Sequence, residues 1–183
     1  MRIAVASDHA GFDLKAAVAR HLAQAGHQVT DLGTDSPEVS VDYPSFGLAV
    51  GRAVAEGRAE RGVCVCGTGI GISMAANKVP GVRAAVVHDV TTASLARRHN
   101  DANVICLGGR TLGWAEALDA VDVFFTAAFE GGHHQPRLDE LAALDGLRAA
   151  GGPGPLVRAA AGPPLERHPR RVGPAPRKAG AEP

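Results

Sequence analysis

The chain has 183 residues, of which 45% are hydrophobic, and its acidic and basic side chains balance to a formal net charge of zero. This length and composition fit one packed domain with a short extension and exclude a largely disordered chain. Zero net charge removes the attraction by which nucleic acids and anionic membranes bind basic proteins. No apolar run approaches the roughly 18 residues that span a bilayer, and the N-terminus lacks a signal-peptide pattern. We therefore expect a cytoplasmic protein that binds neither nucleic acid nor membrane.

Five short β-branched runs, separated by amphipathic stretches, alternate along most of the chain. Between the first two runs, Leu14, Val18 and Leu22 recur at four-residue spacing, which predicts one face of a helix. Gly26 follows as the expected C-terminal cap of that helix. The runs predict strands at residues 3–7, 28–32, 63–66, 83–87 and 103–107.

Further helices are predicted over residues 91–98 and after the fifth strand. The second of these has apolar residues at helical spacing, namely Trp114, Leu118, Val121 and Phe125. Apolar strands that alternate with helices are typical of a parallel sheet covered on both faces. We therefore predict a three-layer αβα fold, a Rossmann-like doubly wound sheet of five parallel strands, in residues 1–149.

Residues 150–183 differ in composition from the rest of the chain. They hold eight of the twelve prolines, among Gly, Ala and Arg, with no sustained apolar period. Such a segment cannot bury enough surface to offset the entropy of ordering it. We expect a disordered, solvated tail.

Three cysteines, Cys64, Cys66 and Cys106, lie in apolar, strand-like runs. An odd number in a cytoplasmic protein argues against a disulfide framework. The spacing of Cys64 and Cys66 lacks the second ligand pair that a zinc site needs. His133 and His134 could be metal ligands, but adjacent histidines on one loop are a weak indication. We expect no metal site.

Polar and glycine residues follow four of the five predicted strands at their carboxyl ends. They are Asp8 and His9 after the first strand, residues 67–73 after the third, His88 and Asp89 after the fourth, and residues 108–110 after the fifth. Parallel sheets bind ligands at this edge. The coincidence predicts a ligand site there.

Cys66 ends the third predicted strand, and a glycine-rich turn leads from it into a helix. Glycines let a ligand approach the backbone, and amides at a helix N-terminus attract negative charge. This placement favours a reactive thiolate. A thiolate beside such amides suits proton abstraction next to a carbonyl, because the amides stabilise the resulting enediolate. The alternative is that Cys66 is a small buried hydrophobic residue, as most free cysteines are.

The same segment also has features of a dinucleotide-binding unit, since Asp89 follows Gly69 by about twenty residues. That motif requires a third glycine where Ile72 stands, and it belongs on the first strand. A non-catalytic nucleotide-binding α/β domain stays an alternative with a poor fit.

Other side chains could act in catalysis or in binding. His99 suits acid–base chemistry near neutral pH, or it is a helix C-terminal residue favoured by the dipole. Asp8 and His9 could contact sugar hydroxyls and a phosphate, or cap the next helix. Arg110 and Arg137 carry the guanidinium geometry that suits phosphate, although a single arginine is more often solvated.

Taken together, five motifs in order resemble type B ribose-5-phosphate isomerase, in a family that also contains allose- and galactose-6-phosphate isomerases. The motifs are residues 7–11, 42–44, 66–71, 75–78 and 99–103, and the likeness runs from residue 1 to 148. It implies an enzyme that interconverts ribose 5-phosphate and ribulose 5-phosphate without metal or organic cofactor. It also implies a homodimer, or a dimer of dimers, with active sites shared between subunits. An isomerase of a six-carbon sugar phosphate, such as allose 6-phosphate, stays open.

The resemblance also implies roles for residues. The cysteine matching Cys66 moves a proton between C2 and C1, and the histidine matching His99 opens the furanose ring. Asp8 and Tyr43 lie near the sugar, and Thr68 acts with the amides of the turn on the enediolate. The remaining substrate-binding residues implied are Gly67, Gly69, Gly71, Ser73 and Asn100, with His9, Arg110 and Arg137 at the phosphate.

One departure from the family pattern concerns the phosphate. The family usually has arginine where His133 stands, and Pro136 is a second local difference. A histidine is only partly charged at neutral pH and cannot bind phosphate bidentately, so we expect weaker or more pH-dependent phosphate binding, or a changed substrate. Some relatives replace the cysteine by a glutamate in the following helix. Ile72, Ser73 and Met74 occupy that stretch here, so the chain resembles the cysteine subtype.

Overall fold

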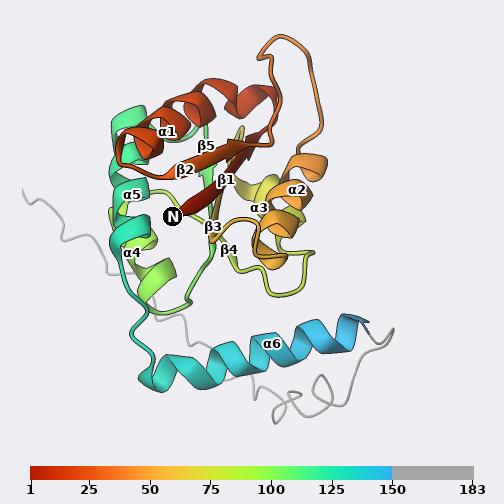
Figure 1. Ribbon diagram of the computed structural model, residues 1–183, viewed down its shortest axis with the longest axis vertical. Helices are drawn as coiled ribbons and strands as arrows, with labels where there is room; N and C mark the ends of the chain where they lie inside the picture. Colours follow the sequence, from red (N-terminus) through yellow and green to blue (C-terminus); the bar gives the residue numbers. More distant parts are fainter. Residues whose placement is uncertain (150–183) are drawn as a thin grey trace, which may run out of the picture.

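Five parallel strands form the central sheet of the computed structural model, which describes residues 1–149 (Figure 1). Their order across the sheet is β2-β1-β3-β5-β4, and every neighbouring pair is parallel. The predicted fold class is confirmed, while the predicted tail, residues 150–183, lies outside the described residues. The strands are β1 (Arg2–Ser7), β2 (Gln28–Asp31), β3 (Arg61–Cys66), β4 (Ala84–Val86) and β5 (Val104–Gly108).

Helices cover both faces of the sheet. One layer contains α1 (Phe12–Gln24), α4 (Val90–Arg98) and α5 (Trp114–Thr126), and the other contains α2 (Tyr43–Ala55) and α3 (Ile70–Ala76). Two short 3₁₀ helices, η1 (His9–Gly11) and η2 (Gly132–His134), lie in the connections. The last helix, α6 (Gln135–Ala149), lies outside the three layers (Figure 1), and its Asp145 accepts at Oδ2 from the amide of Gly81 in the loop before β4 at 2.7 Å. Within residues 1–149, none of the helices is both long enough and apolar enough to cross a membrane.

Alternation along the strands builds two separate cores. Ile105 and Leu107 belong to the cluster under α1, α4 and α5, whereas Val104 and Cys106 belong to the cluster under α2 and α3. Successive side chains of a strand point to opposite faces, so a strand buried on both sides is apolar throughout. By the same alternation, Cys66 lies on the α2 and α3 side, together with Cys64 and Cys106.

The first helix is confirmed in detail. Leu14, Val18 and Leu22 are all buried against the sheet. Gly26 has a positive φ of 85°, and the amide of the next residue, His27, donates to the carbonyl of Leu22 at 3.1 Å. This bond closes a glycine-terminated helix end.

The predicted apolar face of α5 is partly wrong. Trp114 is 52% exposed at the first position of the helix, whereas Phe124 is fully buried. Two alanines, Ala117 and Ala120, occupy the centre of the buried face and have no exposed surface. The spacing of the large apolar residues therefore located the helix and part of its buried face, since Val121 and Phe125 are buried as predicted, but it placed Trp114 on the wrong side.

The sheet has a switch point at its centre. Strands β1 and β3 are neighbours, yet the chain leaves β1 for β2 on one side and leaves β3 for β4 at the far edge. Connections that diverge in this way open a crevice at the carboxyl ends of the two strands. Ser7 pairs with Val65 at these ends, so Asp8 and Cys66 follow side by side.

The fully buried Ile105 in β5 tests how tightly the core is packed. We predict that Ile105→Val lowers the free energy of unfolding by about 0.5–1.5 kcal/mol and Ile105→Ala by about 2–5 kcal/mol, because the larger truncation leaves a cavity. Urea unfolding of the two variants measures the difference. Equal, small losses would contradict a close-packed core at this strand.

Candidate active site

Residues from four segments meet at the carboxyl edge of the sheet. The amide of Gly109 donates to the carbonyl of Cys66 at 2.8 Å, and the amide of Arg110 donates to the carbonyl of Gly67 at 3.0 Å. These bonds fix the end of β5 against the turn after β3. A Cβ placed on Gly67 would lie 3.6 Å from Cδ of Arg110 and 3.9 Å from Cβ of Ala10. The Arg110 side chain therefore covers the turn, beside the segment that follows β1.

Cys66 is nearly buried, with 4% of its surface exposed. The amide of Gly69 donates to its Sγ at 3.2 Å, so the sulfur faces the start of α3. Gly69 has a positive φ of 77°, a conformation that strongly favours glycine. This backbone turn brings the amide back onto the sulfur.

The amides at the start of α3 are only partly used by the protein itself. Gly69 donates to Cys66, and the amide of Ile70 donates to Oγ1 of Thr68 at 3.3 Å. The amide of Ser73 donates to the carbonyl of Gly69, and the Ser73 hydroxyl donates to the carbonyl of Ile70. Helix geometry leaves the amides of Gly71 and Ile72 without a partner inside the helix. Of the predicted donors, these two are therefore the best placed to bind a ligand, and Ser73 is the least.

Tyr43 lies directly over the same turn. A Cβ on Gly71 would come within 2.6 Å of Cζ of its ring, so only glycine permits this contact. The ring itself is 40% exposed at the first position of α2. It forms one wall beside the unpaired amides.

Asp8 and His9 are held by the backbone on the other side of the turn. Oδ1 of Asp8 accepts from the amide of Gly11 at 3.0 Å, which is the helix-capping contact that we considered as the alternative to binding. Nδ1 of His9 lies 3.2 Å from both the amide and the carbonyl of Val41, so the tautomer decides whether Nδ1 accepts or donates there. In the tautomer in which Nδ1 accepts from the Val41 amide, Nε2 carries the proton and can donate to a ligand.

The other predicted residues lie at the opposite edge of the sheet. Helix α4 starts at the carboxyl edge and returns to the amino end of β5, so His99 and Asn100 precede that strand. Val104 pairs with Gly62, whereas Gly108 pairs with Cys66. Four strand steps of about 3.3 Å give a separation of at least roughly 13 Å between the two edges. Helix α5 returns in the same direction and brings His133 and Arg137 to the amino edge.

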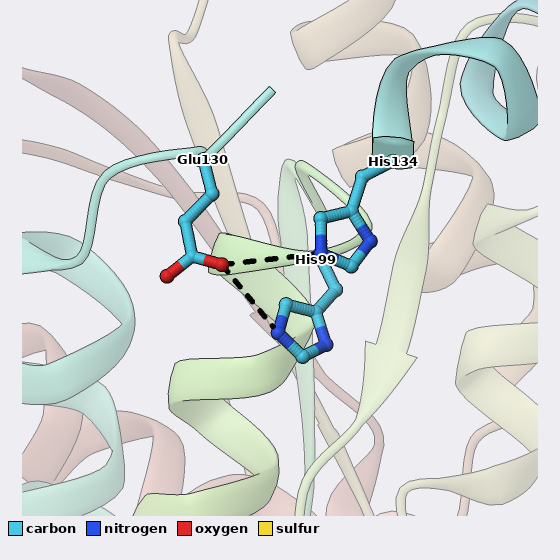
Figure 2. Close-up of side chains that lie close together, drawn as sticks. All are labelled: His99, Glu130 and His134. Atoms are coloured by element: carbon cyan, nitrogen blue, oxygen red, sulfur yellow. Dashed lines mark ion pairs between the residues drawn. The ribbon is translucent and has the colours of Figure 1, made fainter. Parts of the chain in front are cut away.

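A cluster of imidazoles and one carboxylate forms at this amino edge (Figure 2). Nε2 of His99 lies 3.6 Å from Oε2 of Glu130, and Nε2 of His134 lies 3.9 Å from the same oxygen. The rings of His99 and His134 stack with centroids 4.2 Å apart. His133 tilts against His134 at 4.0 Å, and its carbonyl accepts from Nη1 of Arg137.

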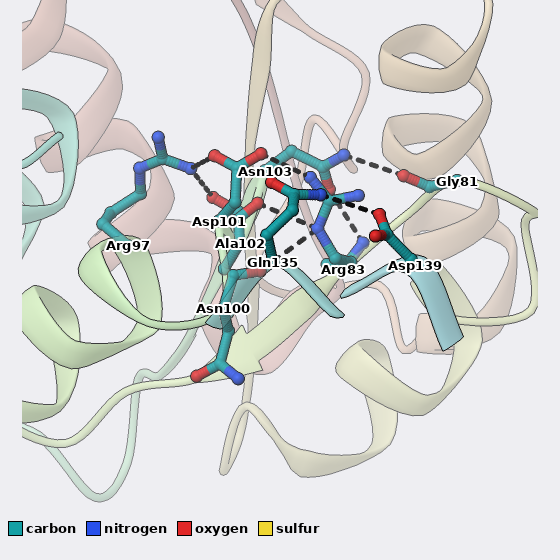
Figure 3. Close-up of polar contacts among 9 residues, drawn as sticks. All are labelled: Gly81, Arg83, Arg97, Asn100, Asp101, Ala102, Asn103, Gln135 and Asp139. Atoms are coloured by element: carbon teal, nitrogen blue, oxygen red, sulfur yellow. Dashed lines mark hydrogen bonds and ion pairs between the residues drawn. The ribbon is translucent and has the colours of Figure 1, made fainter. Parts of the chain in front are cut away.

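An ion-pair network holds the turn that carries His99. Asp101 has a positive φ of 42°, which aspartate tolerates better than most residues. Its carboxylate binds Nη2 of Arg83 and Nη1 of Arg97, each at 2.7 Å (Figure 3). Arg83 also donates through Nε to the carbonyl of Asn100 at 3.1 Å. These contacts fix the backbone next to His99.

Sequence reasoning missed Glu130, Arg83 and Asp101 as parts of this region. Glu130 stands directly before the two glycines that precede His133. A charged residue next to this glycine turn was the only feature of the sequence that could have pointed to it. Asp101 belongs to the motif that we recognised, but its spacing from Arg97 is also that of an ordinary helical ion pair. Nothing in the sequence joins Arg83 to it.

Comparisons with known proteins show the family of this chain. Residues 3–141 match the Ribose/Galactose Isomerase family. The chain belongs to this family. It is 44% identical to ribose-5-phosphate isomerase B of Escherichia coli K12, over 80% of this chain and 98% of the relative.

Solved structures of family members have the same fold. Ribose-5-phosphate isomerase B of Clostridium thermocellum superposes with a TM-score of 0.78 at 48% identity, covering 80% of this chain and 98% of that one. The Mycoplasma genitalium enzyme with bound ribulose-5-phosphate has a TM-score of 0.77 at 42% identity, covering 79% and 96%.

Burial and neighbouring charges act on the ionisation of the amino-edge cluster. Burial lowers the pKa of His134 below its ordinary value of 6.5, and His133 and His99 lower it further. A hydrogen bond from Arg98 lowers the pKa of Glu130. The fold thus favours neutral His134 beside a charged Glu130.

The lowered pKa of His134 predicts a pH effect on stability. The unfolded chain protonates this histidine more readily, so its contribution is present above pH 6.5 and is lost as the pH falls below that value. We predict that the free energy of unfolding falls with acidification, and falls less in His134→Gln. Urea unfolding at several pH values measures both slopes, with the exposed His88→Gln as control. Parallel slopes in wild type and His134→Gln would contradict the assignment.

Proposed function

We propose that this chain is an aldose–ketose isomerase that interconverts ribose 5-phosphate and ribulose 5-phosphate, with Cys66 as the proton-transferring base. The observation that carries the proposal is the position of the sulfur. Sγ of Cys66 lies at the switch point of the sheet and accepts from the Gly69 amide, directly below the start of α3. Family membership and the names of the relatives give the substrate class.

The chemistry follows from the donors around that sulfur. Once the sugar is open, the Cys66 thiolate takes the proton from C2 of the aldose, and the electron pair moves to form an enediolate. Amides that are already oriented stabilise such an oxygen anion at little reorganisation cost, and those of Gly71 and Ile72 are placed for this. Return of the proton to C1, together with transfer of the hydroxyl proton from O2 to O1, gives the ketose and regenerates the thiolate. No atom is lost, and no oxidant is needed.

Side chains at both edges of the sheet bind the phosphate. The donors at the carboxyl edge are the guanidinium of Arg110, which lies over Gly67, and His9 in the tautomer that carries its proton on Nε2. His133 and Arg137, at the amino edge, are donors that a second chain would supply. His133 is exposed, so its imidazole can reach a phosphate.

A complete site requires two copies of the chain. His99, proposed to open the furanose ring, lies a full strand length away from Cys66 of its own chain. A proton donor must come within hydrogen-bond reach of the group on which it acts. In a homodimer with two-fold symmetry, the amino edge of one chain can face the carboxyl edge of its partner, which gives two equal sites. Helix α6 lies outside the three layers (Figure 1) and exposes Leu141 and Leu144, which could pack against a partner chain.

An isomerase of a six-carbon sugar phosphate is the second candidate. It is favoured by His133, which stands where the family usually has arginine. In a longer sugar the phosphate lies farther from the reacting carbons, and a different phosphate ligand would fit that change of position. Turnover of ribose 5-phosphate and allose 6-phosphate, followed as the appearance of ketose, separates the two candidates.

The role of Cys66 is tested by truncation. We predict that Cys66→Ala keeps its fold but loses at least about a hundredfold in kcat, because a positioned base contributes roughly 10²–10⁴-fold. Cys64→Ala removes the same atom two residues earlier, from a fully buried thiol on the same face of the sheet, and serves as control. Near-normal turnover in Cys66→Ala, or an equal loss in Cys64→Ala, would remove Cys66 from the mechanism.

A further inference from the structure

The imidazoles at the amino edge converge on one carboxylate oxygen in a way that hydrogen bonding does not explain (Figure 2). The distances from Oε2 of Glu130 to the two Nε2 atoms, 3.6 Å and 3.9 Å, both exceed a normal hydrogen bond. The three ligand atoms nevertheless all lie within 4.8 Å of one another. Three potential metal-ligand atoms are therefore close enough together to bind one ion.

The donor set is one that zinc uses. Two imidazoles and one carboxylate, with an open fourth position, form a common zinc site. Zinc–ligand bonds of about 2.0–2.1 Å place tetrahedral ligand atoms roughly 3.3 Å apart. The His99 and His134 rings are stacked at 15°, so one imidazole must turn out of the stack before both Nε2 lone pairs can point at one ion, and the distances of 3.6 Å and 3.9 Å to Oε2 of Glu130 must shorten.

The surroundings orient the three ligands. Arg98 binds Oε1 of Glu130 through Nε and Nη2, which leaves Oε2 toward the imidazoles. Outer hydrogen bonds of this kind fix metal-ligating carboxylates in known sites. The His134 side chain is 11% exposed, while His99 and Glu130 are 37% and 40% exposed. The cluster is thus anchored on one side and open to an ion on the other.

We propose that His99, Glu130 and His134 bind Zn²⁺, and that the bound ion inhibits the isomerase by occupying Nε2 of His99. The proposal that Zn²⁺ binds here is argued from the geometry alone. The proposal that bound Zn²⁺ inhibits the enzyme rests on the proposed function, in which His99 opens the sugar ring. The ion is an inhibitor here and takes no part in the proton transfer.

Binding is measured first, without any assay of activity. Titration calorimetry of the full chain with Zn²⁺ should give one ion per chain, and Mg²⁺, which prefers oxygen ligands, should not bind. Co²⁺ in the same site should give the visible absorption of a four-coordinate ion. His134→Gln and Glu130→Gln should each weaken Zn²⁺ binding at least about tenfold, since they remove direct ligands. Circular dichroism checks that both variants are folded.

Matched controls locate the ion. His21→Gln removes another histidine that faces a carboxylate, Asp122, and should leave Zn²⁺ affinity unchanged. Unchanged affinity in both His134→Gln and Glu130→Gln overturns the proposal. So does a loss of binding that follows His133→Gln or Cys66→Ala instead.

Turnover is measured second. Zn²⁺ should inhibit isomerisation with the same concentration dependence as binding, and EDTA should restore the full rate. Zn²⁺ binding at the three ligands without loss of turnover would contradict the proposal that the ion inhibits the enzyme. Absence of turnover before zinc is added would instead count against the proposed function, so the two failures are distinguishable.

Discussion

The direction of strand β5 determines which candidate site residues lie at each edge of the sheet. Strand β5 runs from the turn that carries His99 to the loop that carries Arg110, and its last residue pairs with Cys66. Because α4 and α5 both return to the amino edge, the imidazole cluster and the thiol cannot meet within one parallel sheet. The two halves of the chemistry are separated by roughly 13 Å of strand. In the proposed function, a second copy of the chain closes that distance.

At the carboxyl edge, two close backbone contacts shape the surroundings of the Cys66 thiol. The left-handed conformation of Gly69 returns an amide to Sγ, and the missing side chain of Gly71 lets the Tyr43 ring lie on the helix start. Several donors are consumed in building this turn, since Ile70 binds Thr68 and Ser73 binds inside the helix. What is left for a ligand is small and specific, a pair of amides above a nearly buried sulfur.

The sequence was most informative where one physical rule dominates. Strands buried on both faces must be apolar throughout, and the five predicted runs match β1 to β5 within two residues at each end. Periodicity was less reliable for α5, where small alanines pack and Trp114 is exposed. The candidate site residues were predicted from motifs, whereas their placement at two opposite edges of the sheet follows from its topology. Glu130 and His134 stand four residues apart in one segment, but their contact with His99 joins a second segment, which spacing along the chain cannot reveal.

The requirement for two copies is tested most directly by mixing two inactive proteins. Cys66→Ala and His99→Asn are each purified, co-refolded in equal amounts, and assayed for isomerisation of ribose 5-phosphate. If each site combines Cys66 of one chain with His99 of the other, a mixed dimer holds one intact site and one doubly altered site. About half of the dimers are then mixed, since random pairing is statistical, and turnover should return to roughly a quarter of the wild-type rate. A mixture no more active than its parents would contradict the shared site and place both residues at work within a single chain.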